Sequence, residues 1–76
     1  MNVSLEDFCK HYGLTDDDIR KLQTIRYRPG MPGVEQLPER EWSDGAGFSM
    51  LEWLSFLEHH RQFLKDVRHG LWTTGV

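Results

Sequence analysis

The most regular hydrophobic pattern in the chain lies between residues 49 and 69. Apolar side chains and one histidine alternate there at spacings of three and four residues, which is the period of one helix face. Ser49 with Glu52 forms a capping box, and Gly70 is placed to end the helix. The pattern predicts one long helix over about residues 49–69. Its apolar series is Met50, Trp53, Leu57, His60, Leu64, Val67 and Leu71, widened by Leu54, Phe56 and Phe63.

Two shorter amphipathic segments precede this helix. Ser4 is a good N-cap for a first helix that Gly13 ends, and Thr15 is a good N-cap for a second helix with an acidic first turn. Residues 28–33 contain two prolines and two glycines, which exclude a continuing helix and predict a tight loop. The apolar stripes are Leu5, Phe8, Cys9 and Tyr12 in the first helix and Ile19, Leu22 and Ile25 in the second.

The region after the loop predicts two short helical pieces. Residues 34–37 favour a single turn, and Pro38 suits the first position of a short helix through Trp42 that residues 44–47 end. No segment shows a convincing strand pattern. The sequence therefore predicts an all-α fold, a compact bundle of four or five helices with a long C-terminal helix. Residues 1–76 form one domain, with loose ends at residues 1–3 and 73–76.

Composition and charge narrow the range of functions. The chain contains nine Lys and Arg and twelve Asp and Glu, which gives a net charge of −3. It has no polybasic run that would favour generic binding to nucleic acid or membranes. Cys9 is the single cysteine and has no partner for an internal disulfide, which fits a reducing compartment. No apolar run has the roughly 20 residues of a membrane span. We expect an intracellular protein, cytoplasmic or nuclear.

The sequence offers little for catalysis or metal binding. Cys9 with His11, and His59 with His60, lack the spacing of three or four residues at which helical ligand pairs usually lie. Glycine-rich phosphate loops, nucleophile elbows and zinc-protease motifs are also missing. The sequence predicts a non-enzyme without a metal, cofactor or small-molecule substrate. His60, inside the apolar series, is expected either to bond a polar partner or to lie at a wet interface.

Residues 8–22 resemble a DNA-binding helix-turn-helix motif, with Gly13 in the turn. In such motifs the start of the second helix approaches the DNA, and here residues 16–18 are three aspartates that phosphates would repel. The alternative function is a nucleic-acid-binding domain that uses another face, at the basic end of the second helix. Its candidate residues are Arg20, Lys21, Arg26 and Arg28.

A second resemblance covers residues 3 to about 63. Leu5, Phe8 and Leu14 in the N-terminal part precede a characteristic series made of Leu37, Pro38, Glu39, Glu41, Trp42, Gly47, Phe48, Leu54 and Leu57. This order resembles a sterile alpha motif (SAM) domain. The resemblance implies a five-helix bundle whose last helix is the longest, and a role in protein association.

The long helix is the predicted functional element. Its apolar arc of about 180° exceeds what a helix resting on one neighbour needs. We expect the short helices to cover the first half, from Met50 to Leu57, and the second half to contact a second copy or a helical partner. The predicted function is a non-catalytic protein–protein interaction module. The alternative is an inert monomer in which the N-terminal arm or the Trp72 tail covers this end. The predicted partner-binding residues are Phe56, His60, Phe63, Leu64, Val67, Leu71 and Trp72.

Overall fold

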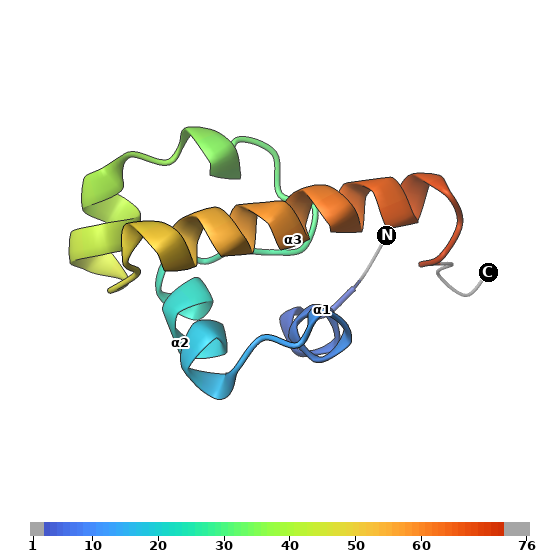
Figure 1. Ribbon diagram of the computed structural model, residues 1–76, viewed down its shortest axis with the longest axis horizontal. Helices are drawn as coiled ribbons and strands as arrows, with labels where there is room; N and C mark the ends of the chain where they lie inside the picture. The colour runs from blue at the N-terminus through green and yellow to red at the C-terminus, as the bar shows by residue number, and fades with distance from the viewer. Residues whose placement is uncertain (1–2, 73–76) are drawn as a thin grey trace.

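The computed structural model describes residues 3–72, which form three α-helices and two short helical elements (Figure 1). In Figure 1 the long helix α3 runs across the molecule, with α1 and α2 on one side of it and residues 34–45 on the other. The described residues contain no strand, so the predicted all-α class with a long C-terminal helix is confirmed. The elements are α1 (Leu5–Tyr12), α2 (Asp16–Thr24), the 3-10 turn η1 (Val34–Gln36), the π-helix η2 (Arg40–Gly45) and α3 (Met50–Arg68).

Side-chain caps fix where the three α-helices begin. The Ser4 hydroxyl accepts a hydrogen bond of 3.0 Å from the backbone of the first turn of α1. Reciprocal capping boxes open the other two helices, formed by Thr15 with Asp18 and by Ser49 with Glu52. Each box satisfies two backbone N–H groups that a helix start leaves unpaired. All three predicted N-caps are therefore confirmed.

A Schellman motif ends α3. The Leu71 N–H donates to the Asp66 carbonyl at 2.9 Å, and the Gly70 N–H donates to the Val67 carbonyl at 3.1 Å. Gly70 has a φ of +80°, a conformation that glycine adopts without steric strain. The Leu71 side chain is 57% exposed, so the motif forms through its hydrogen bonds with the side chain largely in solvent.

The two ends of the described chain both return to the core. Val3 and Trp72 are half-buried and pack against core residues. The prediction of a loose end at residues 1–3 is therefore wrong for Val3, while residues 1–2 and 73–76 lie outside the described residues. Within residues 3–72, no helix has the length and apolar character that crossing a membrane demands.

An aromatic core lies along one face of α3. Phe8 of α1 is completely buried, and its ring centroid lies 5.5 Å from that of Phe63 and 6.4 Å from that of Phe56, both on α3. Edge-to-face contacts of this kind add to the free energy gained by burying the rings. The buried apolar residues are Phe8, Cys9, Leu22, Tyr27, Val34, Trp42, Phe48, Trp53, Phe56, Leu57 and Phe63.

The sequence predicts a short helix that ends before residues 44–47, but the structure has the π-helix η2 at this place. It includes Asp44 and Gly45, because a wider turn forms, in which the Ala46 N–H donates to the Glu41 carbonyl at 3.1 Å. This turn buries Trp42 against α3. The Trp42 and Trp53 rings are stacked, with centroids 5.3 Å apart and an angle of 5° between their planes.

Two substitutions on α3 separate the buried from the exposed face. Phe63→Ala removes a buried ring and should lower the free energy of unfolding by about 3–5 kcal/mol. Leu54→Ala, at a side chain that is 51% exposed, should change it by less than about 1 kcal/mol. Urea unfolding followed by circular dichroism measures both values. Equal losses would contradict the burial pattern described for α3.

Candidate interaction surface

Three of the predicted partner-binding residues are buried inside the molecule. Phe56, His60 and Phe63 are only 2%, 3% and 1% exposed. The expectation that their side chains are available to a partner is wrong for the folded monomer, because α1 covers Phe56 and Phe63, and Tyr27 packs against His60. Phe8 packs against the rings of both Phe56 and Phe63.

Trp72 folds back over the C-terminal end of α3. Its ring centroid lies 5.5 Å from that of Phe63, and its indole N–H donates to the Tyr12 hydroxyl at 3.1 Å. Leu64 and Val67 are half-buried against the core. Of the seven predicted contact residues, Leu71 alone among the described positions is classed as exposed. The second half of α3 therefore has its cover within the chain.

Tyr12 links α1 to the end of α3. Its hydroxyl donates to the Asp66 carboxylate at 2.6 Å. Burial, followed by the hydrogen bond to Asp66, raises the pKa of Tyr12 to about 12. The same hydrogen bond, with a second one from Gln62, lowers the pKa of Asp66. The contact therefore holds a charged carboxylate against a neutral phenol at neutral pH.

His60 is a core residue with a satisfied hydrogen bond. Its Nδ1 lies 2.8 Å from the Tyr27 hydroxyl, which comes from the segment after α2. Burial lowers the pKa of His60, Glu35 opposes this shift, and the Arg61 charge adds to it. Burial also raises the pKa of Tyr27. The pair is neutral in the folded protein at neutral pH, which is the bonded alternative predicted for this histidine.

The exposed apolar side chains of α3 lie at its other end. Met50 is 59% exposed, Leu51 is 80% exposed and Leu54 is 51% exposed. At about 100° per residue, these three positions fall within an arc of about 100° on the solvent side of the helix. The same side continues with Glu58, Arg61 and Lys65, which are polar. The solvent side of α3 is therefore apolar only over its first turns.

A groove of about 290 Å³ lies beside these residues. It runs between the starts of α2 and α3, and the buried side chains of Leu22 and Phe56 contribute to its wall. Its two acidic residues, Asp18 and Glu52, are the partners of the two capping boxes. We call it the α2–α3 groove. It is lined by Leu14, Asp18, Leu22, Phe48, Leu51, Glu52, Ser55 and Phe56.

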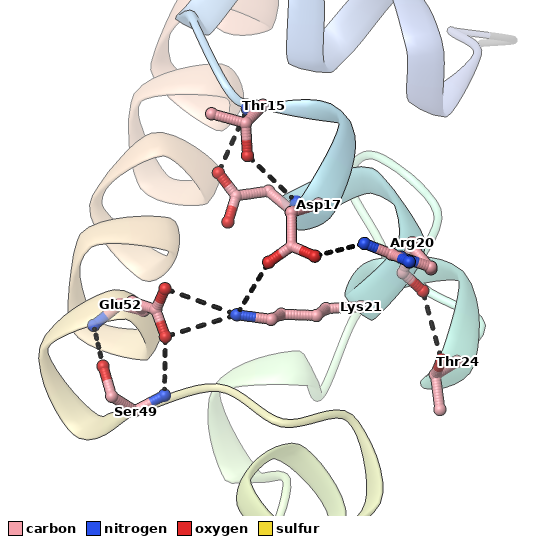
Figure 2. Close-up of polar contacts among 8 residues, drawn as sticks. Thr15, Asp17, Arg20, Lys21, Thr24, Ser49 and Glu52 are labelled. Atoms are coloured by element: carbon pink, nitrogen blue, oxygen red, sulfur yellow. Dashed lines mark hydrogen bonds and ion pairs between the residues drawn. The ribbon is translucent and has the colours of Figure 1, made fainter.

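An ion-pair network joins the two helices at this groove. Figure 2 shows the Lys21 side chain extending from α2 between Asp17 and Glu52. Lys21 Nζ lies 3.2 Å from Asp17 Oδ2 and 3.3 Å from Glu52 Oε2, and Asp17 also pairs with Arg20. Hydrogen bonds from Lys21 and Arg20 lower the pKa of Asp17, and those from Ser49 and Lys21 lower the pKa of Glu52. Both carboxylates are ionised at neutral pH.

The predicted nucleic-acid residues divide into two groups. Arg20 and Lys21 form ion pairs with Asp17, so an acidic side chain accompanies both cations. Arg26 and Arg28 are exposed and follow the end of α2 at Thr24. The described residues do not assemble three His, Cys, Asp or Glu side chains in a way that would hold a metal ion. Neither group of basic residues is a stronger candidate for a binding site than the apolar surface of α3.

Sequence reasoning missed Met50 and Leu54 as surface residues. Both were expected beneath the short helices, as part of the buried series. The buried arc instead centres on Trp53, Phe56 and His60, which places Met50 and Leu54 at its outer margin. The available signal was Leu51, which follows Met50 directly and makes the first turns apolar on more than one side.

The His60 environment predicts a loss of stability in mild acid. The unfolded chain binds a proton at the ordinary pKa of 6.5, while the lowered pKa of His60 keeps the folded chain neutral. Stability should therefore be complete above about pH 6.5 and fall as the pH drops toward the folded-state pKa. Urea unfolding between about pH 7 and about pH 5 measures this slope, which His60→Asn should reduce and His59→Asn should preserve. An unchanged slope in His60→Asn would refute this assignment.

Comparisons of the chain with protein-family models, with curated proteins and with solved structures give no match. The resemblance to SAM domains therefore stays a prediction from the sequence.

Proposed function

We propose that the protein is a non-catalytic interaction module that docks a helical segment of a partner protein at the start of α3. The single observation behind this proposal is the group of neighbouring exposed residues Met50, Leu51 and Leu54, next to the α2–α3 groove. Soluble proteins rarely gather large apolar side chains on the solvent side of a helix without a binding role. Isolated exposed apolar side chains are ordinary, but here three large ones lie within five residues.

The dimensions of the groove favour a protein partner over a small molecule. Pockets for drug-sized ligands usually measure about 300–1,000 Å³, and this groove of about 290 Å³ lies just below that range. A volume of this size instead suits one or two side chains that anchor a partner helix. Complete burial of Leu51 by such a partner would contribute about 1.5–3 kcal/mol.

The proposed docking element is still the long helix, but the contact surface lies at its start instead of along its second half. The predicted contacts lay between Phe56 and Trp72, where α1 and Trp72 provide cover within the chain. The first turns of α3 pack against η2 through Trp53 and leave Leu51 and Leu54 in solvent. A partner helix laid across these turns reaches both leucines and the groove.

A displayed library of random helical peptides tests this function. We expect enriched peptides whose affinity falls by at least about tenfold for Leu51→Glu, because a carboxylate would have to be buried in an apolar contact. Leu71→Glu is the matched control, since Leu71 is another exposed leucine and lies just beyond the C-terminal end of α3. Circular dichroism checks that both variants fold.

Two results would overturn the proposal. One is a selection that yields no peptide binding the wild-type chain. The other is a set of peptides that bind wild type and Leu51→Glu equally, which would place the contact elsewhere.

A further inference from the structure

We infer that the docked partner segment is a basic amphipathic helix whose Lys or Arg side chains face the acidic rim of the α2–α3 groove. This inference rests on the proposed function and adds the chemistry of the partner. It follows from the charges that surround the apolar anchors. The rim comprises Asp18 and Glu52 from the groove lining, with Asp17 and Lys21 of the adjoining ion-pair network, while Arg20 pairs with Asp17 on the side away from Glu52 (Figure 2).

The rim carries a net negative charge. Three carboxylates and one cation give a formal charge of −3 + 1 = −2. Asp18 and Glu52 belong to the first turns of α2 and α3, and each helix N-terminus carries roughly half a positive charge. These partial charges reduce the negative potential without reversing it. A partner that places cations there gains from this remaining charge, and one that places anions there is repelled.

The cation nearest to the groove has little capacity left for a partner anion. The Lys21 side chain is 15% exposed, its Nζ contacts both Asp17 and Glu52, and it lies 5.4 Å from the centre of the Phe48 ring. Its hydrogen bonds to the two carboxylates outweigh the effect of burial and raise its pKa, so it stays charged and paired. An acidic partner segment would have to break these contacts.

The same charges argue against two other occupants. A symmetric dimer through this surface would bring two acidic rims together, because each copy presents the same patch to the other. An anionic membrane would meet the same repulsion. A basic helix in the groove avoids both costs and still covers Leu51 and Leu54, with apolar anchors spaced at i, i+3, i+4 and i+7.

Two synthetic peptides provide the test. Each is a helix of about 16 residues with the same leucine stripe, and they differ only in whether Lys or Glu flanks the stripe. Fluorescence anisotropy with the wild-type chain should show binding of the Lys peptide at least about tenfold tighter at low salt. This preference should shrink at about 1 M salt, where the screening length falls to about 3 Å.

Charge-neutral variants locate the effect. Asp18→Asn with Glu52→Gln removes two rim charges while keeping side-chain oxygens that can accept the capping hydrogen bonds. We expect this double variant to lose most of the preference for the Lys peptide. Glu6→Gln, in the first turn of α1 and outside the groove lining, is the control and should retain it.

The outcomes separate this inference from the proposed function. Equal binding of both peptides, or library binders without basic residues, would overturn the basic partner and leave docking intact. A library without binders would overturn docking itself. Light scattering of the chain alone over a concentration series adds a third outcome, because self-association lost in Leu51→Glu would replace the separate partner with a second copy.

Discussion

The packing of Phe8 against α3 determines which parts of this molecule are core and which are surface. Phe8 is buried at the centre of a group of rings that includes Tyr27, Phe56 and Phe63. Once α1 is fixed there, it covers the second half of α3, and Tyr12 and Trp72 close the end through their shared hydrogen bond. The first turns of α3 then depend on α2, η2 and Phe48 for cover. Their solvent side has no element of the described chain against it.

Chain length explains why the first turns of α3 stay exposed. A domain of this size buries only about 60% of the surface of its unfolded chain, so its few elements cannot surround a long central helix. η2 provides cover through Trp42, which stacks on Trp53, and Phe48 fills the space beside Phe56. Leu51 and Leu54 lie on the remaining side. Their exposure is a consequence of topology, while their apolar character is a property of the sequence that the topology does not require.

Local signals in the sequence predicted the helices well. The predicted partner-binding surface was wrong because burial there depends on contacts between residues far apart in the sequence. Ser4, Thr15 and Ser49 mark helix starts through chemistry contained within four residues, so each was readable without knowing the fold. The burial of Phe63 depends instead on Phe8, which lies far from it in the sequence. The helical pattern around Phe8 predicts that this residue is buried, but not which residue it packs against. The π-helix also escaped prediction, because its wide turn is stabilised by Trp42 packing on α3 and not by a local motif.

The proposed docking surface combines charged and apolar residues whose presence has different causes. Asp18 and Glu52 complete capping boxes, so their charges follow from how α2 and α3 begin, whatever the protein binds. Leu51 has no comparable task, because it is 80% exposed and a polar residue would fit its position on the solvent side of α3 at no cost to the core. The apolar residue therefore carries the argument for docking. The capping carboxylates then select among the partners that such a surface accepts.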